Sequence, residues 1–304
     1  MSESGKHHKS GFVAVIGRPN VGKSTLLNQL VGQKIAIVSD TPQTTRNRIL
    51  GILTQPDAQI LFLDTPGIHK PQHKLGEYMV KSAKGALREV DLILFVSDAT
   101  ESVGPGEHYI LEMLKEEATP VVLVLNKVDL LPKEKLLPVI TKYSGFRDFA
   151  AVVPLSALTG ENTERLLSVI KEALPEGPQY YPEDEVTDQP ERVVAAELIR
   201  EKIFRLTRDE IPHSSVVEVE EMKTRPNGDV FLRATIYVER DSQKGIIIGA
   251  GGAMLKEIGR QARLEMENLF GSRFFVDLWV KVKKDWRNKD GSLRLFGYDD
   301  RDNG

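Results

Sequence analysis

The chain has 304 residues, of which 40% are hydrophobic and 28% charged, and its formal net charge at pH 7 is −3. The length predicts about two domains, and a nearly neutral charge gives no general sign of nucleic-acid binding. The absence of cysteine excludes disulfides, zinc–thiolate sites and cysteine nucleophiles. The polar N-terminus lacks the apolar stretch of a signal peptide, and no apolar run is long enough to span a bilayer, so we expect a cytoplasmic protein.

Short apolar runs alternate with helical patterns over the first part of the chain. We expect strands within 12–17, 58–67, 91–99, 119–129 and 149–157, and helices over 23–32, 75–88, 107–117 and 161–177. Nearly continuous apolar strands that alternate with helices are typical of a mainly parallel sheet covered on both faces. Residues 10–177 are therefore predicted to form an α/β domain.

A glycine-rich turn follows the first predicted strand and opens a helix. Its residues read GRPNVGKST and fit the pattern G-x-x-x-x-G-K-[ST], whose backbone N–H groups surround phosphate oxygens. We expect Lys23 to reach the β- and γ-phosphates and Ser24 to hold Mg²⁺. The predicted phosphate-binding residues are Gly17, Arg18, Pro19, Asn20, Val21, Gly22, Lys23, Ser24 and Thr25.

Two further segments are candidates for the γ-phosphate side of this site. LDTPG begins at Leu63, where Asp64 can reach the magnesium and Gly67 can bring its N–H to the phosphate. In TPQTTRNR, residues 41–48, a threonine could close over Mg²⁺ when nucleotide is bound, unless the segment is only a threonine-rich surface loop. Thr44 and Thr45 are both eligible, and we favour Thr45.

These assignments give two sets of residues. The predicted catalytic residues are Lys23, Thr45 and Gly67, and the predicted metal ligands are Ser24, Thr45 and Asp64. The nucleotide site is extended by Asp64, Thr65, Pro66, Gly67 and Ile68.

Two segments after later strands are expected to select the base. In NKVD, the Asp129 carboxylate can accept hydrogen bonds from the N1–H and the 2-amino group of guanine, a donor pair that adenine lacks. The segment SAL can supply a backbone N–H to the guanine carbonyl. The predicted base-binding residues are Asn126, Lys127, Val128, Asp129, Ser156, Ala157 and Leu158. All these segments follow strands, at the sheet edge where ligands bind in such folds.

The composition then changes twice. Residues 178–190 are rich in proline and acid, which indicates a linker or an extended surface segment. Residues 191–290 predict a helix over 191–207, strands over 214–224 and 228–240 around the hairpin signal RPNGD, a helix through about residue 270 and a last strand over 273–286. Residues 291–304 are predicted to be a C-terminal tail.

Together these motifs resemble a known family. The phosphate loop with QTTR, DTPG, NKVD and SAL resembles translation-factor-class GTPases, and the second unit resembles an α+β type II KH domain. The pairing, with SQKGIIIG and LWVKVKKDWR, is similar to the Era family of bacterial ribosome-assembly GTPases over residues 10–290. The resemblance implies a GTP switch that binds the 3′ end of small-subunit ribosomal RNA and assists assembly of the 30S subunit. It implies no DNA partner, and a cytoplasmic protein with some peripheral association with the cell membrane.

Two residues bear on hydrolysis. Ile68 stands where many small GTPases have a glutamine that orients water, so we expect slow intrinsic hydrolysis. In related GTPases, an asparagine at the place of Asn20 helps to bind K⁺. Asn20 is therefore either a potassium ligand or a turn residue.

The second glycine-rich turn is GAGG, which fits the G-x-x-G turn of KH domains. There it lets the backbone of a single strand approach and clamps about four nucleotides, although a plain turn between helices is the alternative. The family often has a basic residue where this chain has Ala250, and Lys244 and Lys256 flank the turn. The run KVKKDWRNK could follow an RNA backbone or be a solvated face. The predicted RNA-binding residues are Lys244, Ile248, Gly249, Ala250, Gly251, Gly252, Lys256, Lys281, Lys283 and Lys284.

Two other classes of function remain as alternatives. The chain could be a constitutive RNA-binding protein in which nucleotide only stabilises the fold. It could also be a GTPase of membranes or of transfer-RNA modification, which the KH-like order and the lack of a reactive cysteine disfavour.

Overall fold

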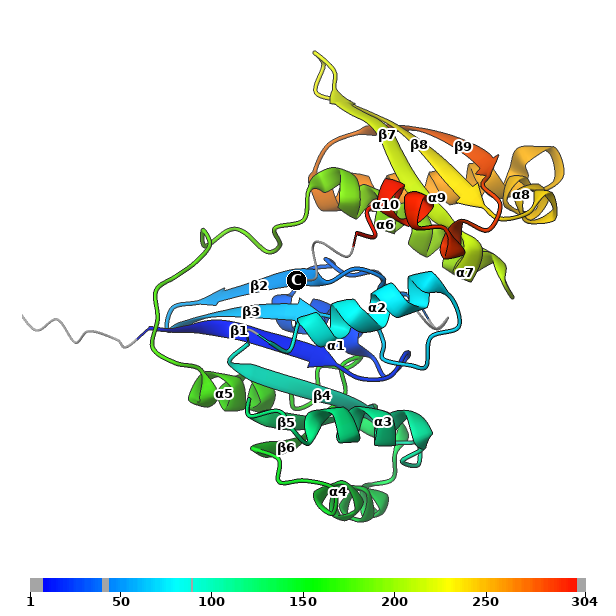
Figure 1. The fold of residues 1–304 in the computed structure, drawn as a ribbon. Coiled ribbons are helices and arrows are strands. Elements are labelled where there is room, and N and C mark those ends of the chain that lie inside the picture. Colours follow the sequence, from blue (N-terminus) through cyan, green and yellow to red (C-terminus); the bar gives the residue numbers. More distant parts are fainter. Residues whose placement is uncertain (1–7, 40–43, 89, 300–304) are drawn as a thin grey trace, which may run out of the picture.

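A computed structural model describes residues 8–39, 44–88 and 90–299, and Figure 1 shows their arrangement in two units. The first unit has a six-stranded sheet in the order β2-β3-β1-β4-β5-β6, and the second a three-stranded sheet in the order β7-β8-β9. Residues 41–43 of the predicted threonine segment lie outside the described residues, as do residues 300–304 of the predicted tail.

The six-stranded sheet is parallel except for β2. Its strands are β1 (Lys9–Ile16), β2 (Ile49–Gln55), β3 (Ala58–Asp64), β4 (Leu92–Asp98), β5 (Val121–Asn126) and β6 (Ala151–Pro154). Strand β3 pairs parallel with β1 and antiparallel with β2. Because the parallel strands all run the same way, the residues that follow β1, β3, β5 and β6 come together at one edge of the sheet.

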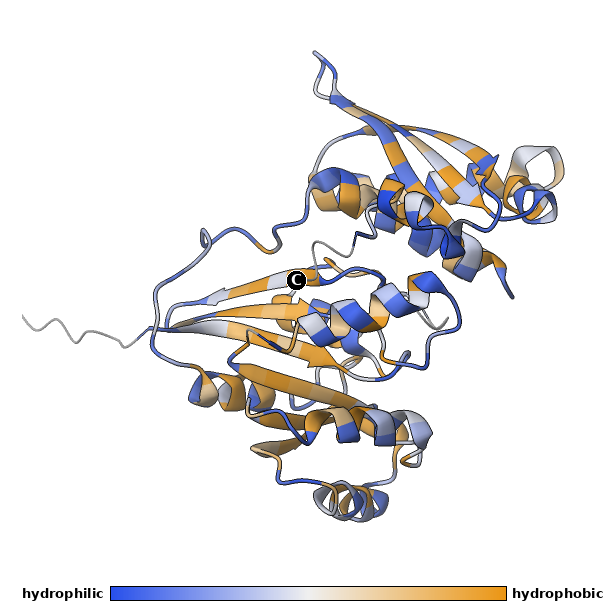
Figure 2. Cartoon of the chain, in the orientation of Figure 1, coloured by the Kyte–Doolittle hydropathy of each residue, from blue (hydrophilic) through white to orange (hydrophobic). Residues whose placement is uncertain are grey.

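Helices cover both faces of this sheet, as the apolar strands predicted. They are α1 (Lys23–Val31), α2 (Lys74–Gly85), α3 (Pro105–Leu114), α4 (Leu136–Ser144) and α5 (Thr163–Ala173). Helices α1 and α5 pack in one core cluster with alternate residues of the strands, and α2, α3 and α4 pack in the other. The sheet interior is almost continuously hydrophobic (Figure 2), which is the pattern of strands buried on both faces.

The sequence analysis did not predict β2 or α4. Strand β2 reads ILGILTQ without clear alternation, and it lies at the sheet edge beside the linker segment. There the N–H of Ile52 donates to the carbonyl oxygen of Val186 (2.9 Å), and the Thr187 hydroxyl donates to that of Leu50 (2.7 Å). The linker is thus an extended segment bonded along the sheet edge, one of the two forms predicted.

The second unit packs helices on one face of its sheet. Its elements are α6 (Glu191–Leu206), α7 (Ile211–Ser214), β7 (Val216–Thr224), β8 (Val230–Val238), α8 (Asp241–Ile248), α9 (Ala253–Phe270), β9 (Phe274–Val282) and α10 (Asp290–Leu295). Strand β8 pairs antiparallel with β7 and parallel with β9. Hydropathy alternates along these strands (Figure 2), as expected when one face is buried against helices.

The C-terminal segment joins the two units. The predicted last strand, 273–286, was too long, because β9 ends at Val282 and Trp286 begins a short 3₁₀ helix. Trp286 is fully buried and packs in a cluster with Leu293 and Tyr298, together with Leu75 and Met79 of α2. The predicted tail therefore contains a helix, α10, whose Leu293 is buried at the contact between the units.

Candidate functional site

The phosphate loop has the backbone that its glycines permit. Gly17 has φ 158° and Gly22 has φ 96°, the latter in the left-handed region. A Cβ on Gly22 would lie 2.2 Å from Nδ2 of Asn126, so only glycine fits there. The loop connects β1 to α1 and leaves the N-terminus of α1 open toward the pocket, where phosphate binding is favoured.

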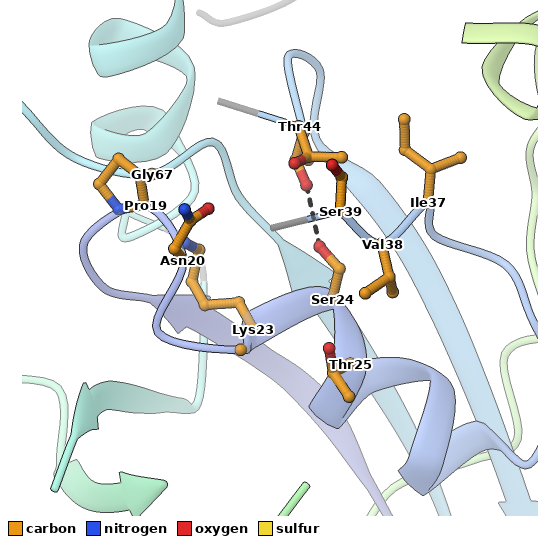
Figure 3. A pocket seen from close by; sticks show the side chains of 12 residues that line it. Pro19, Asn20, Lys23, Ser24, Thr25, Ile37, Val38, Ser39, Thr44 and Gly67 are labelled. Carbon is orange, nitrogen blue, oxygen red and sulfur yellow. Dashed lines mark hydrogen bonds between the residues drawn. The ribbon is translucent and has the colours of Figure 1, made fainter. Parts of the chain in front are cut away.

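Three oxygen-bearing side chains meet beside this loop (Figure 3 shows Ser24 in the pocket). The Ser24 hydroxyl donates to Oδ2 of Asp64 at 2.7 Å, and the Thr45 hydroxyl oxygen lies 3.0 Å from Oγ of Ser24 and 3.3 Å from the same Oδ2. The other carboxylate oxygen of Asp64, Oδ1, is buried and has no hydrogen-bond partner among the described residues. Hydroxyl and carboxylate oxygens of this kind suit Mg²⁺. The structure therefore brings together the three predicted metal ligands.

Lys23 lies in the same pocket and is almost fully buried. Its ammonium donates to the carbonyl oxygens of Arg18 (2.9 Å) and Gly17 (3.3 Å). Burial lowers the pKa of Lys23 to about 8, against an opposite effect of the Asp64 charge. Burial likewise raises the pKa of Asp64, although Lys23 and hydrogen bonds act against it. An anion and a cation in this pocket would restore both charged forms.

Asn126 ties three loops together. Its Nδ2 donates to the carbonyl oxygen of Val21 (2.8 Å), and its Oδ1 accepts from the N–H of Ala157 (2.8 Å). Asn126 is 2% exposed, so both bonds are shielded from water. The side chain fixes the phosphate loop relative to the SAL segment.

The predicted base-binding residues differ in exposure. Ser156 and Ala157 are buried, whereas Leu158 is 77% exposed and the Asp129 side chain is exposed. Lys127 has φ 67°, and its ammonium pairs with Asp98 at 2.6 Å. Burial acts to raise the pKa of Asp98, but the bonds from Lys127 and Thr100 outweigh it and lower that pKa. Asp98, which the sequence analysis did not name, thus orients the Lys127 stem.

The DTPG turn is anchored by hydrogen bonds to the end of β1 and the start of the phosphate loop. The Thr65 hydroxyl donates to the carbonyl oxygen of Val15 (2.9 Å), and the N–H of Ile68 donates to that of Gly17 (3.1 Å). A Cβ on Gly67 would lie 2.7 Å from the backbone nitrogen of Pro19, so this position is restricted to glycine. Ile68 is fully buried, so its side chain packs in the core and does not reach the pocket.

Two side chains near the site have partners outside the pocket. The Arg18 guanidinium contacts the carboxylates of Glu101 and Glu107, so this residue contributes its backbone to the loop. His73 accepts a hydrogen bond from the N–H of Gly76 (2.9 Å) and caps α2, consistent with a structural role.

The sequence analysis missed Ile37, Val38 and Ser39, which line the pocket (Figure 3). The apolar run before the threonine segment was the available signal.

The GAGG turn connects α8 to α9. Gly249, Gly251 and Gly252 have φ of 72°, 58° and 82°, and a Cβ on Gly251 or Gly252 would face open space. The turn is therefore an exposed backbone surface. A groove adjoins it, lined by Gly252, Leu255, Lys256, Gly259, Arg260, Arg263, Val276 and Leu278.

The groove differs from the predicted RNA site. Of the isoleucines before the turn, Ile247 is fully buried and Ile246 is half exposed, and the apolar wall of the groove is made by Leu255, Val276 and Leu278. Residues 252, 255, 256, 259, 260 and 263 recur every three or four positions, which is the helical signal that could have located this face.

The structure does not gather all the predicted basic residues at this groove. Lys256 lines it, but Lys281 pairs with Glu220 (3.2 Å) on the other face of the sheet, because neighbouring strand residues alternate. Lys283 lies over the ring of Phe296. Trp286 is buried, so the run KVKKDWRNK is not one solvated stripe.

The fold and site define a P-loop GTPase joined to a KH domain. A family model described as "50S ribosome-binding GTPase" matches residues 12–127, and a KH-domain model matches residues 210–287. Among the described residues, we find no helix of the length and apolarity that crossing a bilayer requires.

Two solved structures are similar over nearly the whole chain. One is Era in complex with MgGDPNP and nucleotides 1506–1542 of 16S ribosomal RNA, with 45% identity, a TM-score of 0.94, and coverage of 96% of this chain and 99% of that one. The other is a variant of Aquifex aeolicus Era bound to GDP and AlF4⁻, with 45% identity, a TM-score of 0.92, and coverage of 95% and 99%. The chain belongs to the Era family of GTPases, so the resemblance seen in the sequence is confirmed.

Proposed function

We propose that this chain is a GTP-driven switch that binds the 3′ end of small-subunit ribosomal RNA and assists assembly of the 30S subunit. The observation that carries the proposal is the meeting of Ser24, Thr45 and Asp64 beside the phosphate loop. Thr45 belongs to the threonine segment, whereas Ser24 and Asp64 lie on α1 and β3. The position of Thr45 can therefore depend on whether the γ-phosphate is present. The Era structure with MgGDPNP and 16S ribosomal RNA supports the same function.

The residues present fit a magnesium ion. Ser24 and Thr45 would hold it through their hydroxyl oxygens, and Asp64 through its buried carboxylate, whose Oδ1 has no hydrogen-bond partner among the described residues. When bound, Mg²⁺ neutralises charge on the β- and γ-phosphate oxygens. Lys23 would bind the same oxygens, and the N–H of Gly67 would approach the γ-phosphate. Ile68 is buried, and its position carries no glutamine to orient the attacking water. We therefore expect slow intrinsic hydrolysis.

Guanine selection falls to the NKVD loop, which contains Asn126, and to the SAL loop, whose Ala157 donates to Asn126. The Asp129 carboxylate would accept from N1–H and the 2-amino group. The N–H groups of Ser156 and Ala157 already donate to Glu161 and Asn126, so Leu158 would supply the N–H for the guanine carbonyl. The side chain of Lys127, held by Asp98, would cover the ring.

The groove beside GAGG is the proposed RNA site. Its exposed glycine backbone would admit phosphate and sugar, and its apolar wall would receive bases. Lys256 would take a phosphate, and Lys244 flanks the turn. Lys281, Lys283 and Lys284 would contact RNA only where it extends beyond the groove.

Three predictions from the sequence remain part of this proposal. Asn20 has φ 65° and is a K⁺ ligand candidate and a turn residue at once. Equal hydrolysis rates in sodium and potassium would leave only the turn role. We also propose a cytoplasmic protein with peripheral membrane association, which co-sedimentation with vesicles of cell-membrane lipids would test.

The test is binding of a short single-stranded RNA that matches the 3′ end of small-subunit ribosomal RNA, measured with GDP and with a non-hydrolysable GTP analogue. We expect tighter binding with the analogue. Equal binding in both states would favour the alternative, in which nucleotide only stabilises the fold. Absence of binding in both states would contradict the RNA function itself.

A further inference from the structure

Two neighbouring residues of the threonine segment point into different domains. The Thr45 hydroxyl reaches Ser24 and Asp64, as described above. The next side chain, Arg46, enters the KH domain and donates to three carbonyl oxygens, those of Ser215 (2.7 Å), His213 (3.0 Å) and Pro212 (3.3 Å). The backbone of Thr45 therefore cannot move far without pulling a guanidinium out of the other domain.

The site that holds the Arg46 side chain is buried and suits a guanidinium. Arg46 is 4% exposed, and its guanidinium carbon lies 5.6 Å from the ring centroid of Trp286, which is itself fully buried. Its three acceptors lie at the end of α7, where carbonyl oxygens are left without helical partners. A planar guanidinium can donate to several acceptors at once and can stack on an aromatic ring. A lysine ammonium is less suited to both interactions. Moving Arg46 out would remove this donor from the carbonyl oxygens of His213 and Ser215, whereas that of Pro212 would keep the Ser215 hydroxyl.

Helix α6 of the KH domain holds the backbone at two more points, one in the threonine segment and one just before it. The buried guanidinium of Arg200 contacts the carbonyl oxygen of Thr44. The carboxylate of Glu201 accepts from the N–H of Val38 at 3.3 Å. These contacts lie on either side of residues 39–43, so the KH domain holds the backbone both before and after that stretch.

The same interface continues to the helix that lines the RNA groove. Glu265 of α9 pairs with Lys34 of the GTPase domain and with Lys202, and Lys34 pairs with Glu201 at 2.6 Å. Helix α9 begins at the GAGG turn. A shift of α9 would therefore act on Glu201, which holds the backbone of Val38 just before the threonine segment.

We propose that the KH domain acts in cis as the positioning element of the GTPase, with Arg46 and Arg200 as positioning residues that hold Thr45 at the metal site. The inference rests on the proposed role of Thr45 as a magnesium ligand. The phosphate loop and the base-binding loops are held by contacts within the GTPase domain, such as those of Asn126. Loss of the KH contacts should therefore slow hydrolysis while GDP binding is kept.

The test compares Arg46→Ala, Arg46→Lys, Arg200→Met and the exposed control Arg165→Ala in the full chain. The measurements are kcat and KM for GTP, the Kd for GDP, and the Mg²⁺ concentration that gives half-maximal rate. We expect Arg46→Ala to lower kcat by about 10- to 100-fold, the scale of a misplaced group, and to raise the Mg²⁺ requirement. Arg200→Met should have a smaller effect, Arg46→Lys should restore only part of kcat, and Arg165→Ala should match the parent protein.

Two results would overturn the inference. One is a kcat of Arg46→Ala within twofold of the parent protein, an allowance for measurement scatter on the order of 0.4 kcal/mol. The other is a parallel loss of kcat and GDP affinity, which would indicate general unfolding. Thr45→Ala separates this inference from the proposed function. If Thr45→Ala hydrolyses GTP at the parent rate, the proposed metal site is wrong. If Thr45→Ala is slow and Arg46→Ala is not, only the positioning role is wrong.

Discussion

The two ligand sites of this chain are built in opposite ways. The nucleotide site is made mostly of buried polar groups: Lys23, Asp64 and Asn126 are 7%, 0% and 2% exposed, and Asp64 and Asn126 bond to other segments of the chain. The proposed RNA groove offers an exposed glycine turn, apolar side chains and a few surface cations. Groups that are fixed before the ligand arrives lose little entropy on binding, whereas exposed groups adapt to it. We therefore expect large effects of single substitutions at the first site and small, distributed effects at the second.

The largest expected effect comes from Asp129→Asn. The amide cannot accept from both guanine donors, so GTP affinity should fall about 1,000-fold or more, and xanthosine triphosphate should become the better ligand. Binding of both nucleotides by calorimetry measures the exchange. The exposed control Asp184→Asn should keep guanine preference. Retained GTP affinity in Asp129→Asn would show that the base is selected elsewhere.

Asn126→Ala tests whether buried connections determine the nucleotide site. The change leaves the carbonyl of Val21 and the N–H of Ala157 without their partner, which costs about 1–3 kcal/mol. GDP and GTP affinities should therefore fall together by roughly 5- to 150-fold. Asn268→Ala, on an exposed face of α9, is the control. An unchanged affinity would mean that the loops hold their positions without this side chain.

The buried Lys23 predicts a pH dependence of binding. Its pKa is lowered to about 8 by burial, and a phosphate partner would raise it again, so binding above pH 8 takes up a proton. Affinity for GDP should be flat below that pH and weaken above it, by up to about tenfold per pH unit. Calorimetry between pH 7 and 9 in buffers of different protonation enthalpy checks both the slope and the proton uptake. Lys23→Arg keeps its charge and should give a flat profile; the same slope in that variant would contradict the assignment.

The smallest effects are expected at the RNA groove. Lys256→Ala should weaken RNA binding by a few-fold and lower the slope of affinity against salt by about one ion, because one phosphate contact is lost. Ala250→Lys should act in the opposite direction, since it restores the basic residue common in the family. Fluorescence anisotropy at several salt concentrations measures both, with Lys133→Ala as the control. A loss larger than that of Asp129→Asn for GTP would break the contrast between the two sites.

The sequence predicted most of the first domain because its signals are local. Turn geometry and phosphate chemistry explain the residue types at positions such as Gly22, Lys23 and Thr65. Apolar runs located most of the strands. Strand β2 escaped because an edge strand without clear alternation carries a weak pattern. The groove of the KH domain was only partly predicted, since its wall joins residues of α9 and β9 that are far apart in the chain.

By itself, the sequence determined the domain order, the phosphate loop, the position of the motifs proposed to select guanine and the place of the second glycine turn. These features depend on neighbouring residues, whose spacing fixes which backbone groups are free. Only the tertiary structure decided that Trp286 is buried, that Lys281 lies away from the groove, and that Arg46 enters the KH domain beside Thr45. The reason is physical: burial and charge pairing depend on which surfaces meet, and residues 46 and 215 meet only after both domains have folded.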